Sequence, residues 1–328
     1  MSEALYRKYR PHSFKDVVGQ EHVVKVLEAE VLSGDIAHAY LFAGTRGTGK
    51  TSVARIFAHA IGTTPNDIYE IDAASNTSVD DIRSLNESVH TLPFESKYKV
   101  YILDEVHMLS KSASNALLKT LEEPPAHVVF ILATTETHKI PETVLSRCET
   151  YVFKKPSVEV LKKVVLTTAK KEGYIIDESG AELIAILGDG SFRDTLGTVQ
   201  KVIGYSKDKQ ISEEEIRLVT GAPAVSLVHD LVSSITEKDL EKGLLAVKNA
   251  VSQNIDMSVF LKLVLHTTRA VLLWKLGAEA IIKEELSENE MTFVKKAGEE
   301  KNTISSSALV ELLNAYEKTK GAYIPQLP

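Results

Sequence analysis

The sequence predicts an α/β core with a parallel sheet, followed by two all-helical domains. Short apolar, β-prone runs alternate with amphipathic helical patterns over the first 154 residues, and this alternation is typical of βαβ units. After Pro156 the spacing of apolar residues is helical throughout. We therefore expect domain boundaries that give a core over residues 1–154, a small helical domain over 155–220 and a second helical domain over 221–328.

Five strands and four helices are expected in the core, each a run of matching periodicity bounded by turn residues. The strands are Ala39 to Ala43, Ile68 to Ile71, Lys99 to Leu103, Val128 to Ala133 and Thr150 to Phe153. The helices are Glu21 to Ser33, Thr51 to Ala60, Val79 to Val89 and Ser110 to Leu121.

The helical domains are predicted from the same periodicity. A capping box at Ser212 to Glu215 opens the last helix of the first one, which ends near Gly221. The other expected helices are Val158 to Glu172, Ser179 to Leu187, Phe192 to Tyr205, Val225 to Ser234, Leu240 to Gln253, Met257 to Leu276, Glu288 to Glu300 and Ser305 to Lys320.

Composition excludes several classes of protein. The chain has 328 residues, 44% of them hydrophobic, and a formal net charge of −7, which indicates a globular protein. The apolar stretch Ser258 to Leu276 is interrupted by charged residues such as Lys262, and Met1 to Phe14 has no apolar signal region, so we expect a cytoplasmic protein without a membrane span. The single cysteine, Cys148, cannot form an intramolecular disulfide or a thiolate zinc site by itself.

A glycine-rich loop carries the strongest chemical signal. Residues 44–51 match the pattern G-x-x-x-x-G-K-[ST], directly after an expected strand and before an expected helix. Backbone N–H groups of such a loop surround phosphates, Lys50 reaches the β and γ phosphates, and Thr51 coordinates Mg²⁺. The nucleotide-binding segment is Gly44, Thr45, Arg46, Gly47, Thr48, Gly49, Lys50, Thr51 and Ser52.

Two carboxylates follow the strand Lys99 to Leu103. Asp104 is expected to hold Mg²⁺ together with Thr51, and Glu105 to polarise the attacking water. An Asp-Glu pair at a strand end is also often merely solvated, and the glycine-rich loop upstream favours the catalytic interpretation.

Three further residues have a functional and an ordinary interpretation. Thr134 ends an expected core strand and is suited to orient a water, or is a strand residue with no special role. Arg147 has an ordinary interpretation as a surface arginine, and only a family resemblance gives it a functional one. Arg193 lies in the first turn of a helix, where the helix dipole disfavours a cation, so it is a candidate for reaching the γ phosphate or is solvated. The histidines show no metal-binding spacing, and His107 is expected to make a polar contact.

These residues, with several longer motifs, resemble the gamma/tau family of bacterial DNA polymerase III clamp-loader subunits, which are AAA+ ATPases. The likeness runs in order from residue 4 to about residue 220. The motifs that carry it are Tyr6 to Pro11, Phe14 to Gln20, the glycine-rich loop, Ile71 to Asn76, Asp104 to Leu109, Asn115 to Pro125 and Leu145 to Cys148.

The resemblance implies a P-loop AAA+ core, a helical lid and a helical collar that joins subunits into an open ring. It implies ATP and Mg²⁺ as cofactors, and as partners the other clamp-loader subunits, the sliding clamp and primer-template DNA. Polymerase is expected as a partner only if a tail beyond Pro328 exists, and no membrane partner is expected. Such subunits belong to a DNA-directed DNA polymerase holoenzyme, and the expected activity is ATP hydrolysis that opens and loads the clamp.

The resemblance also assigns roles to single residues. It makes Thr134 the sensor 1 residue, Arg147 an arginine finger that enters a neighbour's site, and Arg193 the sensor 2 arginine. It places Val17 and Val18 near the adenine, and Tyr6 to Arg10 near the nucleotide.

Two departures from the family are visible. The family usually carries a four-cysteine zinc module before Asp72, whereas this chain has only the seven residues Ile61 to Asp67 there, so no zinc is expected. Relatives also continue into another collar helix where this sequence reaches Pro328.

DNA contact is expected along helix starts in the core, which in this family meet backbone phosphates. Asn76, Arg83 and Lys111 are the candidates, with solvated helix faces as the alternative. No segment is basic as a whole, so a DNA-binding surface has to come from a local stripe.

Two other functions are weighed against the motor subunit. One is a non-hydrolysing structural subunit of the same machine, and the other is a related AAA+ DNA-remodelling motor such as a branch-migration motor. The intact Lys50, Thr51, Asp104 and Glu105 argue against the first. The Asn115 to Pro125 and Leu145 to Cys148 motifs argue against the second.

Overall fold

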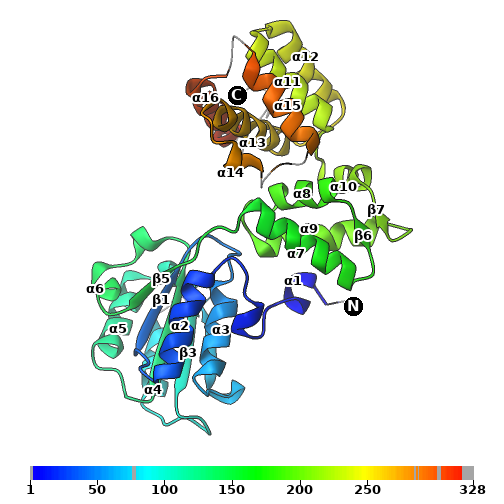
Figure 1. The fold of residues 1–328 in the computed structure, drawn as a ribbon. Coiled ribbons are helices and arrows are strands. Elements are labelled where there is room, and N and C mark those ends of the chain that lie inside the picture. Colours follow the sequence, from blue (N-terminus) through cyan, green and yellow to red (C-terminus); the bar gives the residue numbers. More distant parts are fainter. Residues whose placement is uncertain (1–2, 76–78, 284–285, 287, 301–303, 320–328) are drawn as a thin grey trace. The chain divides into compact units, whose positions relative to one another are not determined.

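The chain folds into two compact units in a computed structural model (Figure 1). The structure describes residues 3–75, 79–283, 286, 288–300 and 304–319. Unit 1 comprises Met1–Val160 with Gly190–Asp194, and unit 2 comprises Leu161–Asp189 with Thr195–Pro328. The three-domain division expected from the sequence stays a prediction.

Unit 1 contains a parallel sheet of five strands in the order β2-β3-β4-β1-β5. Its strands are β1 (Ala39–Ala43), β2 (Ile68–Asp72), β3 (Lys99–Asp104), β4 (Val128–Thr134) and β5 (Glu149–Val152). Because β4 lies between β3 and β1 and is buried on both faces, its sequence is a nearly continuous apolar run. All five predicted strands are present, each with ends within one residue of the expected ones.

Helices cover both faces of this sheet. They are α2 (Glu21–Ser33), α3 (Lys50–Ala60), α4 (Val79–Val89), α5 (Lys111–Glu122) and α6 (Glu142–Leu145), and the short helix α1 (Leu5–Lys8) precedes them in the chain. Alternate strand residues point to opposite faces, so Tyr40 and Phe42 pack with α2 and α3. Leu41 packs on the other face with α4, α5 and α6. The result is a three-layer α/β/α unit with the sheet as its middle layer.

Unit 2 is helical. Its helices are α7 (Val158–Lys171), α8 (Glu178–Leu187), α9 (Phe192–Tyr205), α10 (Glu213–Thr220), α11 (Val225–Glu237), α12 (Leu240–Ser252), α13 (Met257–Lys275), α14 (Glu279–Lys283), α15 (Glu288–Glu299) and α16 (Ser306–Thr319), and the first turns of α7 and α9 belong to unit 1. The expected capping box is present, since Ser212 accepts the Glu215 N–H and the Glu215 carboxylate accepts the Ser212 N–H.

The prediction that strands end with the core is wrong in one place. The strands β6 (Ile175–Ile176) and β7 (Gln210–Ile211) pair in parallel within unit 2. Each has only two residues, which is too short to show an alternating pattern in the sequence.

The helix α13 has the length and composition of a membrane span. It packs against α11, α15 and α16, and Phe260, Val264 and Val271 are fully buried on it. Lys262 Nζ on the same helix donates a hydrogen bond to the Leu187 carbonyl at 2.9 Å. These contacts are typical of the core helix of a helical unit.

Asp67 fixes the connection that leads from α4 to β3. Its side chain is fully buried and accepts hydrogen bonds from the backbone N–H groups of Phe94, Glu95 and Ser96. Burial alone would raise the pKa of Asp67, but these donors outweigh it and lower the pKa to about 2. The folded state thus stabilises the charged form of Asp67 relative to the unfolded chain.

We expect Asp67→Ala to lower the free energy of unfolding by about 2 kcal/mol at pH 7, because three backbone N–H groups lose the buried carboxylate that accepts from them. The folded pKa lies below the ordinary value of 3.8, so this stabilisation is present above about pH 4 and is lost as the pH falls towards 2. Urea unfolding of both proteins at pH 7 and at pH 3 measures the difference. The matched control is Asp35→Ala, at an exposed carboxylate; an equal effect of both changes would contradict the prediction.

Candidate nucleotide site

The carboxyl ends of three adjacent strands bring the predicted residues together. β1, β4 and β3 are neighbours, with Ala43 paired to Thr134 in register. Because the strands are parallel, the glycine-rich loop after β1, Thr134 at the end of β4 and Asp104 at the end of β3 lie at one edge of the sheet. The sequence placed these residues on separate strands, and the strand order makes them one site.

The glycine-rich loop needs glycine at two close approaches. Gly44 has a φ of 157°, and a Cβ there would lie 2.5 Å from the Phe153 carbonyl oxygen. Gly47 has a φ of 76°, and a Cβ there would lie 2.0 Å from Ser191 Oγ. The loop path therefore excludes side chains at both positions.

The start of α3 is suited to an anion. Gly49 occupies the N-cap position, and no side chain there accepts a hydrogen bond from the first helical N–H groups. These N–H groups carry the positive end of the helix dipole, and a phosphate is a suitable acceptor for them. The loop and helix start therefore fit a nucleotide phosphate.

Lys50 lies inside the loop. Its side chain is buried, and Nζ donates to the carbonyl oxygens of Gly44 at 2.7 Å and Thr45 at 2.9 Å. Burial lowers the pKa of Lys50, whereas the carboxylates of Glu105 and Asp104 raise it. A phosphate in the loop would form an ion pair with this buried ammonium group.

Thr51 and Asp104 form a pair of oxygen ligands. Thr51 Oγ1 donates a hydrogen bond to Asp104 Oδ2 at 2.7 Å. Hydroxyl and carboxylate oxygens are the ligands that Mg²⁺ prefers, and it commonly binds through one or two of them together with substrate phosphates. The donor set thus fits the predicted magnesium ion.

Glu105 turns away from Asp104 towards the end of β4. Its backbone is left-handed, with a φ of 50°, and its Oε2 accepts a hydrogen bond from Thr135 Oγ1 at 3.2 Å. Thr134 is fully buried, and its Oγ1 accepts the Glu136 N–H at 3.0 Å and lies 3.1 Å from His107 Nδ1. This hydrogen bond is the polar contact that the sequence predicts for His107.

Arg193 is brought close to the glycine-rich loop. The Phe192 N–H donates to the Gly47 carbonyl at 2.9 Å, and the Asp194 N–H is capped by Ser191 Oγ. The Arg193 guanidinium lies over the Tyr6 ring, 5.1 Å from its centroid. A hydrogen bond and the charge of Arg7, with smaller effects of Arg193, lower the pKa of Tyr6. Tyr6 and Arg193, far apart in sequence, are thus neighbours.

The remaining residues of the predicted nucleotide site differ in exposure. Val17 packs against the core cluster of α2 and α3, whereas Val18 is 44% exposed. Arg10 is half-buried; burial, and then the charge of Arg55, lower its pKa. Their predicted contacts with the nucleotide stay predictions.

Gln20 is a structural part of the site for which the sequence predicted no role beyond its place at the end of a motif. It is fully buried, and its amide donates to the carbonyls of Lys154 at 2.7 Å and Thr48 at 3.4 Å. The Lys154 N–H donates back to Gln20 Oε1 at 3.1 Å. This amide ties the glycine-rich loop to the segment after β5, and a polar residue directly before an amphipathic helix was its only sequence signal.

Arg147 is held within its own chain rather than at the loop. Its guanidinium donates to Glu122 Oε1 at 2.7 Å and to the Thr143 carbonyl at 2.6 Å. About a third of its side chain is exposed. The structure therefore does not bring Arg147 to the glycine-rich loop of the same subunit.

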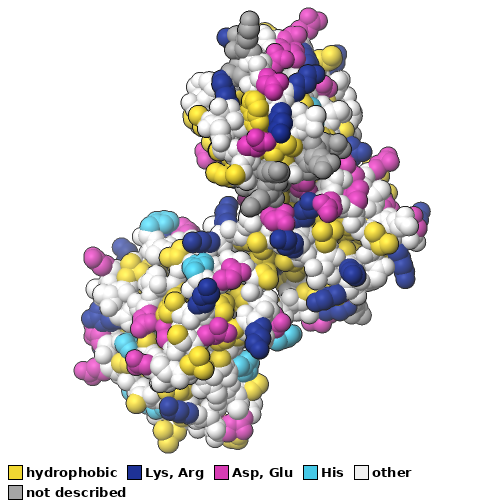
Figure 2. Space-filling model, in the orientation of Figure 1, with side chains coloured by type: hydrophobic (Ala, Val, Ile, Leu, Met, Phe, Trp, Pro, Cys, Tyr) yellow, Lys and Arg dark blue, Asp and Glu magenta, His cyan; other side chains and the backbone are white. Residues whose placement is uncertain are grey.

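Two of the three DNA-contact candidates, Arg83 and Lys111, belong to helices that cover the same face of the sheet. Arg83 is exposed on α4 and Lys111 is exposed on α5, and these two helices pack against each other. Asn76 lies outside the described residues. On the face of each unit seen in Figure 2, Lys and Arg side chains are interspersed with Asp and Glu.

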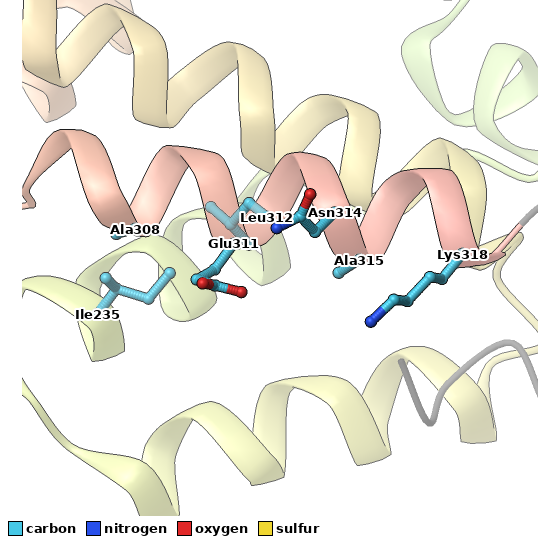
Figure 3. Close-up of a pocket in the computed structure, with 7 residues that line it drawn as sticks. All are labelled: Ile235, Ala308, Glu311, Leu312, Asn314, Ala315 and Lys318. Carbon is cyan, nitrogen blue, oxygen red and sulfur yellow. The ribbon is translucent and has the colours of Figure 1, made fainter.

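A metal site and a reactive thiol are two further kinds of chemistry that the side chains of this protein could support. Among the residues that the structure describes, no group of His, Cys, Asp and Glu side chains forms a metal-binding cluster, and burial raises the pKa of the Cys148 thiol to about 11. A groove of about 410 Å³ in unit 2 lies between Ile235 of α11 and α16, where Glu311, Ala315 and Lys318 face it (Figure 3). None of the predicted site residues lines it.

Family profiles match two parts of the core. The family described as "DNA polymerase III, delta subunit" matches residues 62–157. The family described as "Magnesium chelatase, subunit ChlI" matches residues 13–103.

Similar solved structures have the same fold. The Thermotoga maritima RuvB Holliday junction branch migration motor matches with a TM-score of 0.56 and 22% identity, over 76% of this chain and 86% of that one. A mutant of the same protein matches over 93% of this chain and 98% of that one, with a TM-score of 0.57 and 19% identity. At this identity the likeness concerns the fold, which is a P-loop AAA+ core with helical regions.

Curated relatives are more similar in sequence. The tau subunit of DNA polymerase III from Bacillus subtilis is 40% identical over 305 residues, which are 86% of this chain and 54% of that protein. The tau subunit from Escherichia coli is 37% identical over 85% of this chain and 46% of that protein. The chain thus spans about half the length of these relatives.

A shorter relative is covered more completely. The DNA polymerase III subunit gamma of Buchnera aphidicola is 34% identical over 293 residues, which are 83% of this chain and 79% of that protein. Together with the order of the motifs along the sheet edge, this coverage shows that the chain belongs to the family of DNA polymerase III gamma/tau subunits.

Proposed function

We propose that the protein is the ATP-hydrolysing motor subunit of a replicative clamp loader, which opens a sliding clamp and loads it onto primer-template DNA. One observation carries the proposal: Lys50, the Thr51–Asp104 pair, Glu105 and Thr134 lie at one edge of the sheet, at or directly after the carboxyl ends of three adjacent strands. The proposed partners are other clamp-loader subunits, the clamp and DNA, and the proposed location is the cytoplasm of a bacterium.

Nucleotide binding would use the loop and the start of α3. The backbone N–H groups there donate to no capping side chain at Gly49, and Lys50 is already held at the loop by two carbonyl oxygens. Such a pre-positioned cation loses little conformational freedom when it binds a phosphate. Thr51 and Asp104 would hold Mg²⁺, which neutralises charge on the phosphates.

Hydrolysis would use the carboxylate of Glu105 and the hydroxyl of Thr134. Phosphoryl transfer depends mainly on positioning and charge stabilisation, so Glu105 acts by orienting and polarising a water molecule. Arg193 lies one residue from the Phe192 contact with Gly47, which is a suitable place for a cation that senses the γ phosphate.

Arg147 would act on a neighbouring subunit. In this chain it forms an ion pair with Glu122, whose side chain is 49% exposed, and exposed ion pairs contribute only about 0–1 kcal/mol. Release of Arg147 into a neighbour's site would therefore cost little free energy from the ion pair, in addition to the hydrogen bond to the Thr143 carbonyl. A complete site would then require assembly of the ring.

The alternatives are less well supported. A structural subunit without hydrolysis has no need for the complete set Lys50, Thr51, Asp104 and Glu105. The likeness to a branch-migration motor concerns the fold alone, whereas the sequence likeness is to DNA polymerase III subunits.

Lys50→Ala should weaken ATP binding by about tenfold or more, because charge-assisted hydrogen bonds to phosphate are lost, and should abolish hydrolysis. Titration with a fluorescent ATP analogue and steady-state ATPase assays with clamp, primer-template DNA and partner subunits measure both effects. Lys25→Ala, at an exposed lysine of α2, is the control. Wild-type protein that binds ATP but hydrolyses none in any combination would instead support the structural subunit.

Glu105→Gln should keep ATP affinity within a few-fold and lower the stimulated kcat by about 100-fold or more, since the amide cannot polarise water. Binding and turnover are measured on the same assembled complex. An unchanged kcat would remove Glu105 from the hydrolytic machinery.

Arg147→Ala should leave ATP binding intact and lower DNA- and clamp-stimulated hydrolysis by about 1,000-fold, which is typical of an arginine finger. Glu122→Gln breaks the same ion pair but leaves the arginine in place, so this variant should retain stimulated hydrolysis. Equal loss in both variants would show that the pair matters for structure rather than for catalysis in a neighbour.

A further inference from the structure

His107 lies at the centre of the polar groups that follow β3 and β4. It belongs to the short 3₁₀ helix Val106–Met108, directly after Glu105. Only 6% of its side chain is exposed, yet both ring nitrogens face oxygen atoms from other segments. A buried imidazole with partners on both sides has little freedom to rotate.

The first partner is the hydroxyl group of Thr134. His107 Nδ1 and Thr134 Oγ1 lie 3.1 Å apart in a hydrogen bond, and the Glu136 N–H donates to the same oxygen at 3.0 Å. A hydroxyl group offers one donor and two acceptor sites. Whichever tautomer the ring adopts, His107 and the Glu136 N–H together determine the direction of the Thr134 O–H bond.

The other partners are two carboxylates. Glu105 Oε2 lies 3.5 Å from His107 Nδ1, and Glu136 Oε1 lies 3.4 Å from Nε2. Glu136 is itself held by Lys139 Nζ at 2.8 Å. The imidazole therefore spans from the carboxylate at the end of β3 to the segment that follows β4.

We propose that His107 is a positioning residue for ATP hydrolysis, which sets the Thr134 hydroxyl and the Glu105 carboxylate relative to each other. The inference rests on the proposed function, because it concerns how the same site is ordered. His107 acts through Thr134 and Glu105 and does not itself touch the nucleotide. Its loss would displace two groups whose placement decides the rate of phosphoryl transfer.

The test compares substitutions of His107 in the complex assembled with partner subunits, clamp and primer-template DNA. His107→Ala should lower kcat about 10- to 100-fold, a size typical of misplaced catalytic groups, with the KM for ATP within about threefold because Lys50 and the loop are untouched. His107→Asn keeps a polar group near the position of Nδ1 and should recover most of the lost kcat. Thermal melting of each variant without nucleotide separates lost activity from lost folding.

His138 supplies the matched control. Its Nε2 lies 3.6 Å from the other carboxylate oxygen of Glu136, but 76% of its side chain is exposed. His138→Ala should keep the wild-type kcat. A double-mutant cycle adds a second readout: in a Thr134→Ala background, His107→Ala should cost much less than in the wild type.

The outcomes separate this inference from the proposed function. If His107→Ala keeps the wild-type kcat, or if its effect adds fully to that of Thr134→Ala, the proposed role of His107 is wrong. The motor function is still supported in that case if Lys50→Ala abolishes hydrolysis. A loss that appears only in KM or in melting temperature also overturns the role of His107. If the wild-type complex hydrolyses no ATP at all, both the motor and the positioning role are wrong.

Discussion

The parallel pairing of β1, β4 and β3 is the constraint on which the site depends. It places Ala43 opposite Thr134 and Leu103 opposite Leu132, so three strand ends meet at one edge of the sheet. A slip of one residue would exchange the faces on which Tyr40 and Leu41 are buried. The apolar packing against α2, α3, α4 and α5 therefore fixes the register, and the register in turn brings the loop, the Asp104 carboxylate and the Thr134 hydroxyl together.

The glycine-rich loop is shaped from both sides. Gln20 ties its Thr48 carbonyl to the segment after β5, and Ser191 and Phe192 contact Gly47 from the start of α9. A side chain at Gly47 would meet Ser191, and one at Gly44 would meet the Phe153 backbone. The glycines are thus required by contacts with residues more than a hundred positions away, as well as by the phosphates they are proposed to bind.

Much of this architecture was predictable because its signals are local. Strand alternation, capping residues and the pattern of residues 44–51 are all read within a few positions, and the predicted strands are present. Other parts depend on contacts that no local pattern encodes. The helices α1, α6 and α14 and the strands β6 and β7 are too short for periodicity, and the network of His107, Thr134 and Glu136 forms only because β3 and β4 are neighbours. The buried amide of Gln20 was likewise invisible, since its partners lie 28 and 134 residues away.

The two arginines assigned by resemblance occupy different environments, and this difference bears on how the site is completed. Arg193 stacks over Tyr6 beside the glycine-rich loop, so its contribution is available within one chain. Arg147 instead donates to Glu122 and to the Thr143 carbonyl at its own helix end. If the proposed roles hold, a single chain would contain every group for binding ATP, and Arg147 would complete only the site of a neighbouring subunit. Because the Arg147 ion pair is exposed and weak, a neighbouring site with a bound triphosphate would compete for this arginine under the proposed function, and hydrolysis would then be coupled to assembly of subunits.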